Sequence, residues 1–228
     1  MLHCQRILAM PSKRYVRRTV EFLDRAEMDA LLAAPDRSTW VGRRDHVILI
    51  VALQTGLRAS ELISLRRCDI VSGTGAHIRC EGKGRKQRAV PLTELTKRVL
   101  AVWLAERAGR PQDPLFPTRT GRRLSRDAIE QRVATHAAAA AERCPSLLAK
   151  KLHPHVLRHS CAMSLLQGRV DRAVMALWLG HADIRSTDAY VHADLTIKQR
   201  ALAATMPASV RPGRYQPPDT LLAFLESL

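Results

Sequence analysis

The sequence predicts a mainly α-helical protein that contains a small three-stranded antiparallel sheet. Apolar residues recur at helical spacing up to about residue 65 and again from residue 95. Between these parts, residues 68–92 alternate in short pieces separated by glycine-containing turns, a pattern typical of strands. The chain has 228 residues with 46% hydrophobic content, which is enough for one good-sized core.

Three helices are expected before the sheet. Asp24 is a candidate N-cap of the first helix, and Pro35 lies just beyond its end. A second helix with a strongly apolar middle is expected over residues 44–53. Gly56 interrupts the pattern, and helical spacing resumes over residues 59–65.

The expected strands lie near residues 70–71, 77–80 and 88–92. Turn signals at residues 72–75 and 82–84 separate them. The second hairpin therefore has its tip near residues 82–86, in a strongly basic stretch.

Helices return after the sheet, the first of them over residues 95–108. Ser125 is a candidate N-cap for an alanine-rich helix that ends near residue 142. Pro154 suits the first residue of a helix that ends near Gly168, and Asp171 caps another that ends at Gly180. Four segments complete the expected chain: a helix that holds Tyr190, a helix over 196–205, a Pro-rich linker over 207–218 and a short apolar helix to residue 228.

The composition indicates a polyanionic partner. Lys and Arg number 37 and Asp and Glu 21, a formal net charge of +16, which suits DNA, RNA or an acidic membrane surface. The longest apolar run, residues 47–53, is far shorter than the roughly 20 residues of a membrane span, and the N-terminus lacks the apolar region of a secretion signal. The five cysteines form no C-x-x-C pair, so we expect no disulfide framework and favour a cytoplasmic location.

Arg58 is the first candidate for a phosphate-binding residue. It follows the Gly56 break at the start of a helix, and Glu61 lies three residues later on the same helical face. A guanidinium that a carboxylate holds in place suits the non-bridging oxygens of a phosphodiester. An ordinary surface ion pair explains the same spacing.

His155 and Arg158 are a second candidate pair. They share one face of the helix that begins at Pro154, and the positive end of that helix favours a phosphate. His159 points elsewhere and is expected to be structural. A zinc site would use His155 and His159, but the glutamate of H-E-x-x-H is absent and no third ligand is evident, so we expect no metal.

Tyr190 is the candidate nucleophile. It lies nine residues after His181, which follows the helix exit at Gly180. The chain has only three tyrosines. Taken alone, Tyr190 is also compatible with a packing residue of the core.

Together these segments resemble the tyrosine recombinase (phage integrase) family. Residues 55–62 (TGLRASEL) resemble its first arginine motif, and residues 155–159 (HVLRH) resemble its H-x-L-R-H motif. Residues 179–181 (LGH) followed by Tyr190 match its L-G-H and nucleophile spacing, and residues 82–88 (GKGRKQR) resemble its lysine-bearing hairpin. Four motifs in the family's order make the resemblance very specific.

The resemblance implies a role for each catalytic residue. Tyr190 attacks the scissile phosphorus and forms a 3′-phosphotyrosine. Arg58 and Arg158 neutralise charge on the non-bridging oxygens in the transition state. His155 accepts or positions the tyrosine proton, and His181 donates a hydrogen bond to a phosphate oxygen.

Lys83 is the general acid that the resemblance implies, since it would protonate the departing 5′ oxygen. Lys86 lies near the same hairpin tip and is the alternative. Glu61 is expected to orient the surroundings of Arg58. Neither ATP, a metal nor another cofactor is required, because the bond energy is stored in the protein–DNA link.

Further basic residues are expected to contact phosphates of double-stranded DNA, for position rather than for sequence. They belong to the hairpin and to the start of the alanine-rich helix: Arg79, Arg85, Lys86, Arg88, Arg122, Arg123 and Arg126. A solvated basic face is the alternative interpretation.

Two ends of the chain depart from the usual family pattern. A basic arm, residues 1–19, precedes a catalytic domain that is expected over residues 20–206. The N-terminal core-binding domain of the family is therefore expected to be absent. Without it, we expect the protein to bind isolated DNA sites weakly and with strong salt dependence. The family implies a homo-tetramer on synapsed DNA, formed from monomers or dimers. The helix over 219–228 on its linker suits docking into a neighbouring subunit, with docking in its own subunit as the alternative.

The resemblance thus implies a site-specific recombinase or integrase of a bacterium or phage. A type IB topoisomerase shares the covalent chemistry but relaxes supercoils without exchanging strands, and the L-G-H spacing favours the recombinase. A non-catalytic DNA-binding remnant or regulator is the other alternative. It is disfavoured because no catalytic position is lost from the sequence.

Overall fold

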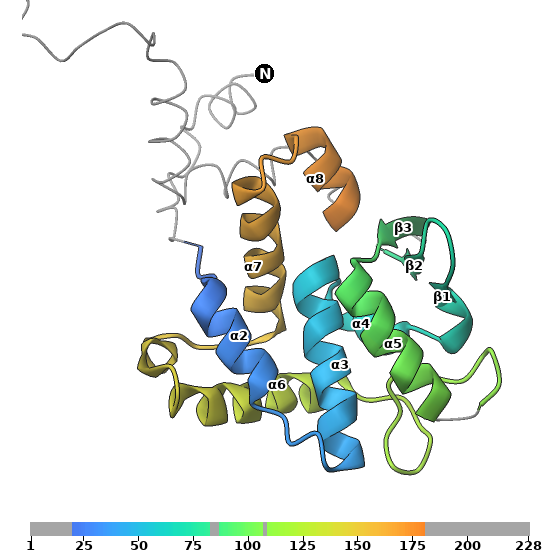
Figure 1. Ribbon diagram of the computed structural model, residues 1–228, viewed down its shortest axis with the longest axis horizontal. Coiled ribbons are helices and arrows are strands. Elements are labelled where there is room, and N and C mark those ends of the chain that lie inside the picture. Colours follow the sequence, from blue (N-terminus) through green and yellow to red (C-terminus); the bar gives the residue numbers. More distant parts are fainter. Residues whose placement is uncertain (1–19, 83–86, 107–108, 181–228) are drawn as a thin grey trace, which may run out of the picture. The chain divides into compact units, whose positions relative to one another are not determined.

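Figure 1 shows the computed structural model of the chain, which describes residues 20–82, 87–106 and 109–180. The chain divides into two compact units, Met1–Ala193 and Asp194–Leu228, and every described residue belongs to the first. The predicted N-terminal arm, the domain boundary after residue 206 and the helices expected beyond residue 180 lie outside the described residues. Among the described helices, none combines the length and apolar character that crossing a membrane requires.

The described elements are mostly helices. In chain order the α-helices are α2 (Arg25–Ala33), α3 (Trp40–Thr55), α4 (Ala59–Ser64), α5 (Glu94–Glu106), α6 (Arg126–Ala141), α7 (Pro154–Gln167) and α8 (Arg172–Leu179). The shorter elements are the 3-10 helices η1 (Arg67–Asp69) and η3 (Pro145–Ala149) and the strands β1 (Ile70–Val71), β2 (His77–Glu81) and β3 (Gln87–Pro91). The predicted fold class, mainly α with a small antiparallel sheet, is confirmed.

Helix α3 lies at the centre of this unit and packs against α2, α5 and α7 (Figure 1). Residues 47–53 are all buried, as a continuous apolar run requires, so the helix faces the core on nearly every side. It ends at Gly56, whose backbone is left-handed with φ +63° and ψ +25°. Glycine adopts that conformation without a Cβ penalty, which explains why the helix stops here.

The start of α3 differs from the prediction, which began the helix at residue 44. The helix begins at Trp40, because the Thr39 hydroxyl oxygen accepts the N–H of Gly42 at 3.0 Å and caps it. Two charged residues, Arg44 and Asp45, lie near the start of this helix. Both are buried, with an Nη2 to Oδ1 distance of 2.8 Å, so each compensates the charge of the other inside the helix.

The sheet has the strand order β1-β2-β3, and both pairings are antiparallel, as predicted. Ile78 of β2 pairs with Val90 of β3, and Cys80 pairs with Arg88. Ile78, Cys80 and Val90 are buried while their neighbours along the strands are not, so one face of the hairpin packs on the core.

The beginning of the described chain is tied to η3 by a buried carboxylate and to α7 by a main-chain hydrogen bond. Glu27 closes a capping box with Asp24, accepts the Ser146 hydroxyl at 2.8 Å and pairs with Lys150. The main-chain N–H of Leu23 donates to the Ser160 hydroxyl at 2.9 Å. Helix η3, which contains Ser146, was not predicted, because its position depends on this distant contact rather than on a periodic local pattern.

Helices α7 and α8 share a small second core that includes Cys161, Met175 and Leu179. A Cβ placed on Gly56 would lie 2.6 Å from Leu179 Cδ2, so the end of α8 lies directly against the turn that ends α3. The predicted helix signals at Asp171 and Gly180 are confirmed, since Asp171 caps α8 and Gly180 ends it with φ +65°.

Candidate active site

Arg58 lies directly after the turn that ends α3, as predicted. Its main-chain N–H donates to Glu61 Oε2 at 2.8 Å, and its Nη1 donates to Glu61 Oε1 at 3.0 Å. The Glu61 side chain is 3% exposed and that of Arg58 is 36% exposed. The pair is therefore not an ordinary surface ion pair: a buried carboxylate holds a guanidinium whose tip remains accessible.

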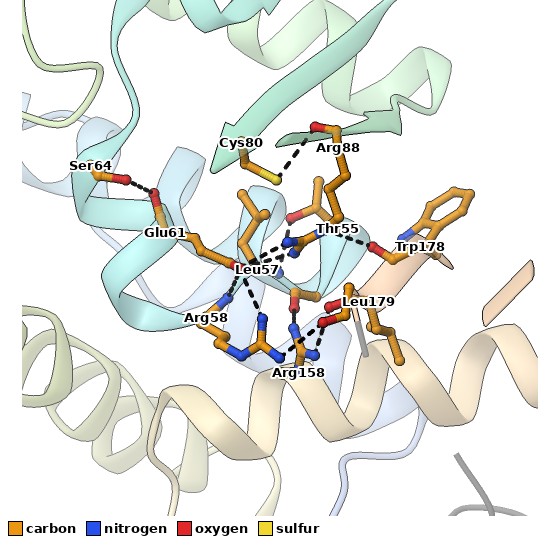
Figure 2. Close-up of polar contacts among 12 residues, drawn as sticks. Thr55, Leu57, Arg58, Glu61, Ser64, Cys80, Arg88, Arg158, Trp178 and Leu179 are labelled. Atoms are coloured by element: carbon orange, nitrogen blue, oxygen red, sulfur yellow. Dashed lines mark hydrogen bonds and ion pairs between the residues drawn. The ribbon is translucent and has the colours of Figure 1, made fainter. Parts of the chain in front are cut away.

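Arg158 joins the ends of two helices. It lies on α7 and is 2% exposed. Its Nη1 donates to the carbonyl of Gly56 at 2.6 Å, and its Nη2 donates to the carbonyl of Leu179 at 2.7 Å (Figure 2). The two predicted arginines meet at this place, because Arg58 Nη2 donates to the next carbonyl, that of Gly180, at 3.1 Å.

Arg88 takes a different place from the one predicted. We expected it to contact DNA, but its side chain is only 12% exposed. Its Nη1 and Nη2 donate to the two oxygens of Glu61 at 2.8 and 2.9 Å, and its Nε donates to the carbonyl of Trp178 at 3.1 Å (Figure 2). One signal was available in the sequence: Arg88 and Val90 lie two residues apart on a strand, so both face the core.

The charges of this cluster support one another. Burial raises the pKa of Glu61, but the hydrogen bonds from Arg88 and from the Arg58 main chain, together with both guanidinium charges, outweigh it and hold the pKa below its usual value. Burial lowers the pKa of Arg88, and its pairing with Glu61 reverses the effect and raises it. Glu61 is therefore a carboxylate and Arg88 a cation throughout the physiological pH range.

His155 lies in the first turn of α7, one turn before Arg158. Partial burial of its ring, and then the positive charges of Arg158, His153 and Arg58, lower the pKa of His155 below its usual value. Its ring stands edge-on to that of His159, with 4.4 Å between the centroids. The imidazole is thus neutral at neutral pH and able to accept a proton.

No metal site is evident in the described ranges, where no group of three or more His, Cys, Asp or Glu side chains is arranged to hold an ion. The close pair of His155 and His159 has no third ligand among these residues. Zinc coordination therefore has no support from this part of the chain.

Four other residues predicted to contact DNA are exposed: Arg79, Arg122, Arg123 and Arg126. Arg79 and Arg123 line a polar hollow of about 480 Å³ beside β2, together with Arg66. Arg66 was not among the predicted residues; its Nη1 donates to Gln112 Oε1 at 2.7 Å. Five further predicted site residues lie outside the described residues: Lys83, Arg85, Lys86, His181 and Tyr190.

Comparisons with known proteins show the family to which the chain belongs. The phage integrase family matches residues 21–196. A protein named integrase/recombinase y4rC from Sinorhizobium fredii is 53% identical over 224 residues, which cover 98% of this chain and 68% of that protein. Tyrosine recombinase XerD of Pseudomonas putida is 38% identical over 179 residues, covering 75% of this chain and 56% of XerD.

Solved structures give the same result. XerH recombinase, in a post-cleavage complex with its palindromic difH substrate, matches with a TM-score of 0.69 and 27% identity, covering 82% of this chain and 53% of XerH. XerA recombinase matches with a TM-score of 0.70 and 27% identity, covering 90% of this chain and 68% of XerA.

The fold is therefore that of a tyrosine-recombinase catalytic domain. The chain belongs to the phage integrase family, which confirms the membership inferred from its motifs. It spans between about half and two thirds of the length of the relatives described above.

Proposed function

We propose that this protein is a site-specific recombinase that cleaves and rejoins double-stranded DNA through a covalent bond between Tyr190 and a 3′ phosphate. The observation that carries the proposal is the meeting of Arg58 and Arg158 at the end of α8, one residue before His181. Family membership supports the same chemistry. The matched relatives are named recombinases or integrases, which favours recombination over topoisomerase activity or a purely regulatory role.

The described residues supply the electrostatic part of the reaction. Arg58 presents a partly exposed guanidinium on a buried carboxylate, which suits a non-bridging phosphate oxygen. Arg158, in contact with two carbonyls, adds positive charge to the same place. His155 has a lowered pKa and takes up or directs the proton that leaves the tyrosine.

The remaining roles rest on the motifs alone. Tyr190 is the nucleophile, and His181 donates a hydrogen bond to a phosphate oxygen. Lys83 is the general acid for the departing 5′ oxygen, with Lys86 as the alternative. Arg79, Arg85, Lys86, Arg122, Arg123 and Arg126 hold DNA phosphates, and Arg88, given its contacts with Glu61, does not.

The partner of this surface is duplex DNA, in keeping with the net charge of +16 and with the DNA complex of XerH. We propose a homo-tetramer on synapsed DNA, in which the apolar helix over 219–228 docks into a neighbouring subunit. Deletion of residues 219–228 then abolishes tetramer formation on DNA, and unchanged tetramer formation contradicts docking of this helix into a neighbouring subunit. A cytoplasmic location stays a prediction.

Covalent capture tests the chemistry and identifies the preferred DNA site in the same experiment. The full chain is incubated with a pool of duplexes of random sequence, each carrying a nick at a random position, so that a short 5′-hydroxyl fragment is lost after cleavage and the adduct persists. Denaturant-resistant protein–DNA adducts are isolated, and their DNA is sequenced. In a parallel reaction that is not denatured, adding a 5′-hydroxyl duplex of matching sequence releases the tyrosine and joins the strands.

The chain offers matched controls, because it contains three tyrosines: Tyr15, Tyr190 and Tyr215. We expect Tyr15→Phe and Tyr215→Phe to form the adduct and Tyr190→Phe to form none. An adduct that persists in Tyr190→Phe, or no adduct with the unaltered chain, contradicts the proposal.

A further inference from the structure

Arg88 uses every nitrogen of its guanidinium within the protein. Two nitrogens bind both oxygens of Glu61, and the third binds the carbonyl of Trp178. The guanidinium thus joins three elements, since Arg88 lies on β3, Glu61 on α4 and Trp178 on α8. Such a bidentate pair fixes orientation as well as distance.

Three arginines hold three consecutive carbonyls at the end of α8 (Figure 2). Arg88 donates to the carbonyl of Trp178, Arg158 to that of Leu179 and Arg58 to that of Gly180. The last carbonyls of a helix have no partner within the helix and lie at its negative end, so cations are favoured there. The exit of α8 is therefore held in one orientation by contacts from three separate elements.

Glu61 couples two of these arginines. Its Oε1 accepts from Arg58 Nη1 at 3.0 Å and from Arg88 Nη1 at 2.8 Å. Without Arg88, the Glu61 carboxylate would keep Arg58 as its ion-pair partner and would be free to turn toward the Arg58 guanidinium. Arg58 would then move with it, because its main chain and its guanidinium both bind Glu61.

We infer that Arg88 is a positioning residue for the cleavage reaction: by holding Glu61 and the exit of α8, it sets the place at which Arg58 meets the phosphate. The inference rests on the proposed function. In this role Arg88 makes no contact with DNA. It differs from a purely structural residue because it acts on cleavage through the position of Arg58.

A substrate lacking phosphate charge tests this assignment. The duplex recovered by covalent capture is synthesised with either the natural phosphate or a methylphosphonate at the cleaved position, where a neutral methyl replaces one charged oxygen. A misplaced Arg58 slows cleavage of the charged phosphate, whereas the methylphosphonate has less charge for the arginine to neutralise. Because both substrates meet the same population of folded protein, the ratio of their cleavage rates is insensitive to partial unfolding.

We expect Arg88→Met to cleave the phosphate about 100-fold more slowly and to regain most of that loss on the methylphosphonate. Arg88→Lys keeps the charge but cannot hold both Glu61 oxygens and the Trp178 carbonyl together, so it shows the same pattern. Arg43→Met is the matched control, since Arg43 also pairs with both oxygens of a glutamate and with main-chain carbonyls, away from the site. Its rate ratio stays that of the unaltered chain.

Equal losses on both substrates for Arg88→Met, or full activity of Arg88→Lys on the phosphate, overturn the inference. Failure of the proposed function gives a different result, because the unaltered chain then forms no adduct through Tyr190 on either substrate.

Discussion

Replacing Gly180 with alanine tests how tightly the exit of α8 packs on Arg88. Gly180 has φ +65°, and an added Cβ would lie 2.6 Å from Arg88 Nη1 and 2.9 Å from its Cζ. A flexible arginine would simply move away. This guanidinium is held by both oxygens of Glu61, so it can move only by weakening that pair.

The expected cost has two parts. A left-handed backbone costs about 1 kcal/mol for a residue other than glycine. Weakening the charge-assisted bonds of a buried carboxylate adds about 2 kcal/mol, within the usual range for hydrogen bonds to charged groups. Gly180→Ala is therefore expected to lower the free energy of unfolding by about 3 kcal/mol.

Urea unfolding measures this cost, and Gly75→Ala is its control. Gly75 also has a positive φ, +72°, but an added Cβ there meets nothing within 4 Å, so only the backbone cost of about 1 kcal/mol is expected. In an Arg88→Met background the cost of Gly180→Ala should fall toward the same value, because a methionine side chain yields. The reasoning is refuted if Gly180→Ala and Gly75→Ala cost the same, or if the Gly180 and Arg88 substitutions are additive.

Two further predictions concern buried ionisable groups. Burial raises the pKa of the Asp45 carboxyl, but hydrogen bonds from His136 and Arg44 outweigh burial and hold this pKa below its usual value. The stability that the carboxylate contributes is therefore fully present above the ordinary pKa of an aspartate and is lost as the pH falls through the lower, folded-state pKa. Asp45→Asn should lower the free energy of unfolding in urea by about 3 kcal/mol at neutral pH. The difference from the unaltered chain should shrink in acid, and a difference that does not change with pH contradicts this. Burial raises the pKa of Cys161 to about 12, so this thiol forms little of the reactive thiolate. Iodoacetamide should therefore alkylate the half-buried Cys144 well before Cys161, and equal alkylation rates contradict the raised pKa of Cys161.

Most helix boundaries could be predicted because their causes are local. Asp24, Ser125 and Asp171 each accept a main-chain N–H two or three residues ahead, and Gly56 and Gly180 each end a helix with a left-handed backbone. The start of α3 has a local cause too, since Thr39 accepts the main-chain N–H of Gly42, but this cap was not recognised and the prediction began the helix at residue 44. The burial of Arg44 could not be predicted, because the Pro117 carbonyl that accepts from it lies 73 positions away in sequence.

In the candidate site, too, local features could be predicted from the sequence and contacts between distant segments could not. Arg58, His155 and Arg158 were found from short motifs, because each belongs to a local pattern of residue types. The carbonyls that these arginines bind could not be found, since Arg58 and Gly180 are 122 positions apart in sequence. Arg88 was assigned to DNA because its neighbours are basic, and the period of the strand, which turns it inward, was a better guide than its charge.

The positive charge of the arginines around Glu61 favours a negatively charged ligand at this site. Arg58 and Arg88 share the single carboxylate of Glu61, which compensates one of their two positive charges in a partly buried place, and Arg158 adds its own positive charge nearby. Burial makes a surplus charge costly unless a partner arrives. A phosphodiester carries one negative charge, and Arg58 is the more exposed of the two guanidiniums, so the surplus lies where a phosphate can reach it. Under the proposed function, Arg88 and Glu61 fix the geometry, and Arg58 keeps the positive charge that attracts a DNA phosphate.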